Sequence, residues 1–113
     1  MKQKNYEKNS DYNKIIAQAF NSINKKKFNE AQEYFLEAIK IDKKNYVAYI
    51  NLSNLYLIKN DTSSSINCLF DFLKKNGFNY SIANHLAKVC AQFNLNKDFD
   101  NLLKMKKFKN VKH

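Results

Sequence analysis

Apolar side chains recur three and four positions apart along the chain, in six stretches separated by short polar segments. This spacing places apolar residues on one face of an α-helix, whereas a half-buried strand would alternate them with polar residues. The six stretches lie at residues 15–23, 28–39, 49–56, 66–73, 82–93 and 99–105. The pattern predicts six amphipathic helices joined by short turns, so that consecutive helices run antiparallel.

Several polar residues and one glycine predict where these helices begin and end. Asp61 and Asn79 precede the fourth and fifth stretches, where a short polar side chain accepts a hydrogen bond from the first helical turn. Gly77 follows the fourth stretch, where a helix commonly ends in a residue of positive φ. Asn96 opens the sixth helix, and the irregular pattern over residues 94–98 predicts a small length change there.

The helices form three pairs that repeat every 34 residues. The small residues of the first helices follow this interval, at Ala19, Ser53 and Ala87. The second helices repeat a large apolar residue at the same interval, at Phe35, Leu69 and Leu103. The residue before the small one is leucine in the second and third pairs, and Gln18 is the exception in the first. An interval of this length indicates an array of stacked helix pairs.

The composition favours one all-α domain. The chain has 113 residues, one glycine and no proline, whereas β-rich architectures need many tight turns. No window approaches the roughly 18 consecutive apolar residues of a membrane-spanning helix, and the first residues lack the apolar stretch of a signal peptide. We therefore expect a soluble, cytoplasmic protein with no membrane span.

The chain resembles the tetratricopeptide repeat family in two of its three helix pairs. The family's first helix carries W-x-x-L-G-x-x-Y, and the middle copy here reads Tyr49-x-x-Leu52-Ser53-x-x-Tyr56. The family's second helix carries A-x-x-x-F, and the first copy here reads Ala31-x-x-x-Phe35-x-x-Ala38. The third copy is degenerate but keeps Leu86-Ala87, and Lys43 stands where the family usually has its closing proline.

This resemblance implies a right-handed superhelix, or solenoid, of three antiparallel helix pairs. The repeat domain would span residues 12–108, with repeats at about 12–44, 46–78 and 80–108. Residues 1–11 would form a polar N-terminal extension, and residues 109–113 a basic C-terminal tail. In such an array each repeat packs only against the repeats next to it.

The resemblance also implies a non-enzymatic scaffold whose concave groove binds a peptide segment or helix of another protein. The first helix of each repeat would line that groove. The residues carried over to this chain are Ile16, Phe20, Ile23, Ile50, Asn51, Asn54, Leu57, Asn84 and Lys88. The same apolar positions also suit packing between helices, so that both interpretations stay open for Ile16 and Ile50.

The charge of the chain gives an alternative function. The net charge is +10, and all 20 basic residues are lysine. Lysine attracts polyanions, but arginine, which reads guanine edges and grips phosphate with two hydrogen bonds, is absent. We favour a simpler explanation of the charge, a bias towards A/T-rich codons that the 18 asparagines share. If a nucleic acid or another polyanion binds, the candidate contacts are Lys104, Lys106, Lys107 and Lys109.

No residue pattern is typical of catalysis, of a cofactor or of a metal site. His85 and His113 are far apart in the sequence, and a single glycine cannot build a phosphate-binding loop. Cys68 and Cys90 lie in apolar stretches, where we expect packed thiols. We therefore expect no enzyme activity, with an accessory domain of an enzyme as a weaker alternative.

The last helix pair raises a separate expectation about assembly. A repeat array normally ends in a polar capping helix, and the pattern after Lys109 contains none. The face around Phe99, Leu102 and Met105 is therefore a candidate docking surface, either within a larger complex or in a homo-oligomer.

Overall fold

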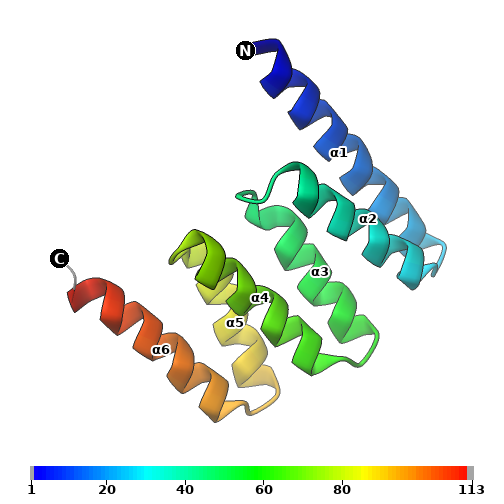
Figure 1. Ribbon diagram of the computed structural model, residues 1–113. Coiled ribbons are helices and arrows are strands. Elements are labelled where there is room, and N and C mark those ends of the chain that lie inside the picture. The colour runs from blue at the N-terminus through cyan, green and yellow to red at the C-terminus, as the bar shows by residue number, and fades with distance from the viewer. Residues whose placement is uncertain (1, 112–113) are drawn as a thin grey trace.

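Residues 2–111 form six helices in three antiparallel pairs (Figure 1). The computed structural model describes the backbone of residues 2–111 and the side chains of residues 10–104. Its helices are α1 (Lys2–Asn24), α2 (Phe28–Ile41), α3 (Tyr46–Ile58), α4 (Thr62–Asn76), α5 (Tyr80–Gln92) and α6 (Asn96–Val111). No strand occurs between residues 2 and 111, so the predicted all-α class is confirmed.

The turn inside each helix pair has the same geometry. Lys26, Asn60 and Asn94 end the first helices in the left-handed region, with φ of 60°, 62° and 57°. The next residue then donates its N–H to the carbonyl five positions earlier, in the pairs Lys27–Ser22, Asp61–Tyr56 and Leu95–Cys90. The second helices consequently begin 34 residues apart, at Phe28, Thr62 and Asn96. The small length change predicted over residues 94–98 is wrong, because the irregular pattern there reflects exposure of α6 rather than an insertion.

The predicted caps are present. The carboxylate of Asp61 accepts a hydrogen bond from the N–H of Ser64 at 3.1 Å, and the side chain of Asn79 accepts one from Ile82 at 3.0 Å. Asn45 caps α3 in the same way through Val47. Gly77 ends α4 with φ of 86°, a conformation that L side chains rarely adopt. These local devices set the boundaries of α3, α4 and α5.

Helix α1 is longer than the pattern predicts. It begins at Lys2 and includes residues 2–11, which the sequence pattern separated as a polar extension. Neither glycine nor proline interrupts this segment, so the helix continues through it. Tyr12 marks the start of the packed part, because its side chain is buried and its hydroxyl accepts a hydrogen bond from the N–H of Ala48 in α3.

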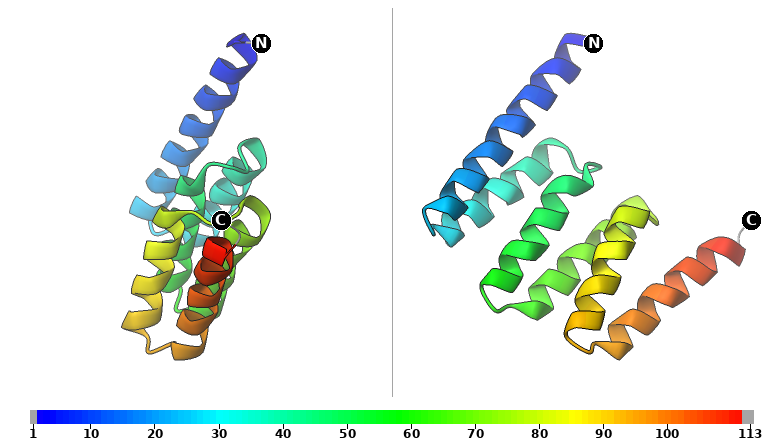
Figure 2. Two further views of the ribbon diagram at one scale, coloured as in Figure 1. Left: turned by 90° about the vertical axis from the view of Figure 1, so that its left-hand side faces the viewer. Right: turned by 180° about the vertical axis from the view of Figure 1, so that it is seen from behind.

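The helices lie in two layers, with α1, α3 and α5 in one and α2, α4 and α6 in the other (Figure 2). The Cα atoms span only 14 Å in the thinnest direction. Each of α3 and α5 contacts its own partner and the second helix of the preceding pair. The described residues form three apolar clusters. They lie around Phe35, Leu52 and Leu55, around Leu69, Ile82 and Leu86, and around Tyr12, Ala38 and Ala48.

Small residues allow the paired helices to approach. Ala19 and Ala31 are fully buried between α1 and α2. Ser53 and Ser65 are also fully buried, and their hydroxyls form a hydrogen bond that joins α3 to α4. Since each buried hydroxyl has a partner, serine replaces alanine here without leaving an unsatisfied polar group. None of the helices within the described residues is long and apolar enough to cross a membrane.

Candidate binding groove

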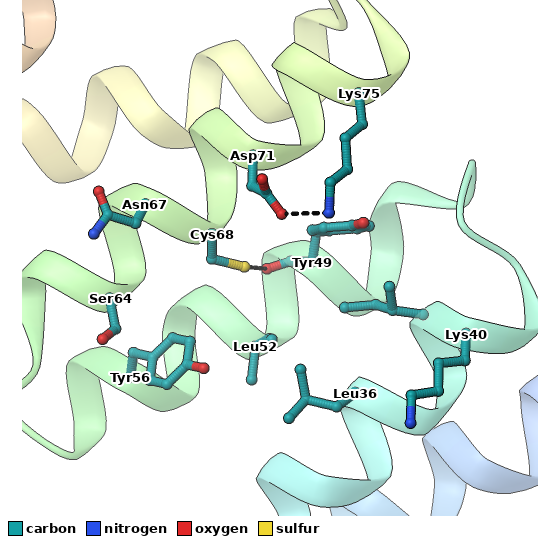
Figure 3. Close-up of a pocket in the computed structure, with 11 residues that line it drawn as sticks. Leu36, Lys40, Tyr49, Leu52, Tyr56, Ser64, Asn67, Cys68, Asp71 and Lys75 are labelled. Atoms are coloured by element: carbon teal, nitrogen blue, oxygen red, sulfur yellow. Dashed lines mark hydrogen bonds and ion pairs between the residues drawn. The ribbon is translucent and has the colours of Figure 1, made fainter.

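A cavity of about 570 Å³ lies over α3, between α2 and α4 (Figure 3). Its floor is formed by one face of α3, because Tyr49, Leu52 and Tyr56 are three and four positions apart. The remaining lining residues are Leu36, Ile39 and Lys40 of α2 and Ser64, Asn67, Cys68, Asp71 and Lys75 of α4. We call this surface the α2–α4 groove.

The groove exists because α2 and α4 both pack on α3 without closing over it. The floor residues are shared with the core: Tyr49 and Leu52 are buried, and the ring of Tyr49 packs edge-on against Phe72 with centroids 4.9 Å apart. At the mouth, by contrast, 41% of the Leu36 side chain is exposed. The groove therefore offers an apolar floor on a rigid helix and one accessible apolar residue on its wall.

The titratable groups in the floor are held in their neutral forms. Burial raises the pKa of Tyr49 and of Tyr56, so both phenols stay protonated at neutral pH. Burial also raises the pKa of the Cys68 thiol to about 12, and its sulfur donates to the carbonyl oxygen of Tyr49 at 3.5 Å. A protonated thiol is a poor nucleophile, which fits the prediction of a packed cysteine.

One end of the groove is rich in lysine. A second cavity of about 460 Å³ continues from the first, shares Ile39, Lys40, Tyr49 and Lys75 with it, and adds Lys43, Lys44 and Asn76. The carboxylate of Asp71 pairs with Lys75 at 3.0 Å, and Lys40, Lys43 and Lys44 are exposed. The Asn76 amide donates to the carbonyl oxygen of Lys43 and so ties the end of α4 to the α2–α3 turn.

These lysines have a structural role as well. Lys40 lies in the last turn of α2 and Lys43 and Lys44 follow it, so their positive charge offsets the partial negative charge of the helix end. The two roles are compatible, because a cation at an exposed helix end remains accessible to an acidic group of a ligand. The groove thus combines an apolar floor with a positively charged end.

The predicted groove residues on the first helices lie elsewhere. Ile16 and Ile23 are half-buried against the cluster around Phe35, and Ile50 and Leu57 are half-buried against the cluster around Leu69. These four residues therefore pack between helices, which for Ile16 and Ile50 was one of the two interpretations left open.

The more exposed members of the predicted set are separate from the α2–α4 groove. Phe20 is 43% exposed and lies edge-on against Phe35. Asn51 donates its side-chain amide to the carbonyl oxygen of Val47 in its own helix. Asn54, Asn84 and Lys88 are exposed, and of the predicted set Asn84 alone lines one of the cavities described here, a smaller one between α5 and α6.

The sequence contained one signal for the α2–α4 groove. Ala31, Phe35 and Ala38 form the buried stripe of α2, and Leu36 lies outside that stripe, next to charged Glu33, Glu37 and Lys40. A single exposed leucine is common on protein surfaces, so Leu36 marks the groove only together with its neighbours in the structure. The floor of the groove could not be recognised from the sequence, because the spacing of Tyr49, Leu52 and Tyr56 is typical of ordinary core residues.

The other predicted contacts are described only in part. Lys104 is exposed on α6, whereas the side chains of Lys106, Lys107 and Lys109 lie outside the described residues. Among residues 10–104, no three His, Cys, Asp or Glu side chains gather closely enough to hold a metal ion. His85 is half-buried, and its Nε2 atom has no hydrogen-bond partner.

Comparison with known proteins adds no family to this picture. No protein-family model matches the chain, and a search of curated proteins finds no significant match.

Proposed function

We propose that the chain is a non-enzymatic scaffold, similar to tetratricopeptide repeats, that binds an apolar and partly acidic segment of another protein. The α2–α4 groove is the observation that carries this proposal. Its apolar floor suits the side chains of a helix or extended segment, and its lysine-rich end suits carboxylates of the same segment. A partner with both features would gain apolar burial in the groove and charge attraction during approach.

The regular geometry of the helix pairs supports the family assignment within this proposal. The turns at Lys26, Asn60 and Asn94 and the starts of α2, α4 and α6 all follow the 34-residue interval. A right-handed superhelix is the corresponding arrangement of the three pairs. We place the partner site in the α2–α4 groove, between two second helices, rather than on the concave face of the first helices that the sequence resemblance implied.

Two exposed residues provide a matched test. Leu36 on the α2–α4 groove and Phe20 on the face of the first helices are 41% and 43% exposed, so that an aspartate at either position should leave the fold intact. Immobilised chain would be used to capture proteins from a nuclease-treated native lysate at about 150 mM and about 500 mM salt, because screening at high salt weakens exposed charge contacts more than apolar ones.

The proposal predicts one stoichiometric partner that is retained at both salt concentrations. Leu36→Asp should abolish its capture, Phe20→Asp should not, and circular dichroism should be unchanged in both variants. Loss with Phe20→Asp alone would place the site on the first helices. Retention of the partner by both variants would contradict the proposal.

The polyanion alternative gives a different result in the same experiment. Nucleic acid recovered at low salt and lost at high salt, with no protein retained, would favour the lysines as the binding site. Removal of residues 104–113 should then weaken binding and flatten its salt dependence. This alternative draws support from the +10 charge and from the exposed Lys40, Lys43 and Lys44.

A further inference from the structure

The second helices occupy equivalent places in the three pairs, but only two of them are covered. Phe35 in α2 and Leu69 in α4 are fully buried, whereas Leu103, at the same place in α6, is 47% exposed. One turn earlier, Ala31 and Ser65 are also fully buried, whereas Phe99 is 38% exposed. The sequence thus places large apolar residues on α6 at positions that are buried in the other two pairs.

Helices α2 and α4 are each covered by the first helix of the next pair, through residues at equivalent positions. Helix α3 covers α2 with Ala48, Leu52 and Leu55, and all three are buried. Helix α5 covers α4 with Ile82, Leu86 and Val89, which stand 34 residues later and are also buried. Both covering helices therefore present apolar residues at i, i+4 and i+7. No helix with this pattern covers α6 within residues 2–111.

The uncovered face is hollowed. A cavity of about 130 Å³ between α5 and α6 is lined by Ala83, Ala87, Phe99, Leu102 and Leu103, among others. Ala83 stands where the middle pair has Tyr49, so the missing side-chain volume opens the hollow. An apolar cavity of about 150 Å³ holds a benzene-sized group, so this hollow suits one large apolar side chain from outside.

A second copy of the chain does not supply the missing helix. In α1 the residues that correspond to the covering positions are Lys14, Gln18 and Asn21, and all three are exposed. A head-to-tail copy would therefore place a polar helix on an apolar face. A symmetric pairing of two α6 faces would bring together two chains that each carry a net charge of +10.

We propose that the α5–α6 face, defined by Ala83, Ala87, Phe99, Leu102 and Leu103, binds a helix of another protein with apolar residues at i, i+4 and i+7. The remaining positions of that helix are acidic. Lys88 lies one turn after Asn84 of the hollow, and Lys104 follows Leu103; both are exposed, and so is Asp100, which follows Phe99 and carries the opposite charge. This site goes beyond the α2–α4 groove and does not depend on it.

The test uses a synthetic, helix-stapled peptide as the probe. It carries Ile, Leu and Val at i, i+4 and i+7 and glutamate at most other positions, and a control peptide has the same composition with the apolar residues spread around the helix. Fluorescence anisotropy should show binding of the first peptide to the full chain and binding at least about tenfold weaker for the control, because the control cannot bury its apolar residues together.

Variants of the chain locate the site. Leu103→Glu and Phe99→Glu should each weaken binding about tenfold or more, whereas Ile58→Glu, at an exposed residue that lines neither this hollow nor the α2–α4 groove, should not. Circular dichroism checks that each variant is folded. Two variants of the face are used so that the test still works if one of them fails to fold. Failure of this proposal leaves the capture experiment with Leu36→Asp unaffected, so the two proposals are distinguishable.

Two results would overturn the inference. The first is equal affinity for both peptides, or binding by the patterned peptide that neither Leu103→Glu nor Phe99→Glu weakens. The second is a dimer, measured by light scattering across a range of concentrations, that Leu103→Glu dissociates. That dimer would make a second copy the occupant of the face.

Discussion

Leu52 and Gln18 occupy the same place in successive first helices, and so do Leu69 and Leu103 in successive second helices. In each comparison one residue lies inside the stack and the other at an end. At the N-terminal end the residue is polar, whereas at the C-terminal end Leu103 and Phe99 stay apolar although they are exposed. The outer face of α1 is therefore polar at this position, as suits contact with water. The outer face of α6 is apolar, like the positions that are buried between helices in the other two pairs.

The largest expected effect on the free energy of unfolding comes from exchanging the residue types at Leu52 and Gln18. Leu52→Gln removes a buried leucine and buries an amide, so the free energy of unfolding should fall by about 3 to 6 kcal/mol. Gln18→Leu changes an exposed position and should alter it by no more than about 0.5 kcal/mol. Urea unfolding followed by circular dichroism measures both. A large loss with Gln18→Leu would mean that the N-terminal face is not free.

Replacing Leu69 or Leu103 with alanine should have a smaller effect on the free energy of unfolding. Leu69→Ala leaves a cavity in the core and should cost about 2 to 5 kcal/mol of unfolding free energy. Leu103→Ala removes a half-exposed side chain and should cost about 1 kcal/mol or less. The same urea experiment applies. Equal costs would show that the α5–α6 face is covered in solution and would remove the basis for a docking surface there.

These comparisons also explain how far the sequence predicted the fold. The six helices and the caps at Asp61 and Asn79 were predictable because they depend on local spacing and on nearby hydrogen bonds. Gln18 looked like an exception to the repeat, and the structure explains it, because Gln18 is exposed on α1 whereas Leu52 is buried at the same place in α3. The irregular pattern near Phe99 has a corresponding cause, since Phe99 is exposed on α6 within the described residues.

The candidate site was less predictable for a physical reason. Tyr49 and Leu52 belong to the core and to the floor of the α2–α4 groove at once, and a pattern of apolar positions cannot distinguish the two roles. The groove depends on how far α2 and α4 diverge over α3, which is a property of tertiary packing. Leu36 alone stood outside the pattern in a way that the sequence could reveal.

The caps of α5 and α3, the first helices of the last and middle pairs, can be compared directly. Asn79 accepts a hydrogen bond from Ile82, and Asn45 accepts one from Val47 at the start of α3. Asn79→Ala and Asn45→Ala should each lower the unfolding free energy by about 1 kcal/mol. Thermal unfolding compares them. A negligible effect of Asn79→Ala alone would indicate that the start of α5 frays in solution.

The smallest expected effect is a pH dependence confined to α5. His85 stands where α3 has Asn51, and burial, together with the charge of Lys88, lowers its pKa below the usual 6.5. The unfolded chain therefore binds a proton at higher pH than the folded chain does, so stability is lost as the pH falls from about 6.5 towards the lower folded pKa. Below that value the loss stops growing.

His85→Asn makes α5 like α3 at this position and removes the titrating group. The unfolding free energy of the variant should vary less than that of the original chain between about pH 7 and pH 5, and carboxylates that titrate in both chains cancel in the difference. Unfolding in urea at several pH values provides the measurement. Parallel curves over this range would mean that the imidazole of His85 is as accessible to protons in the folded chain as in the unfolded one, and that its unpartnered Nε2 is open to water.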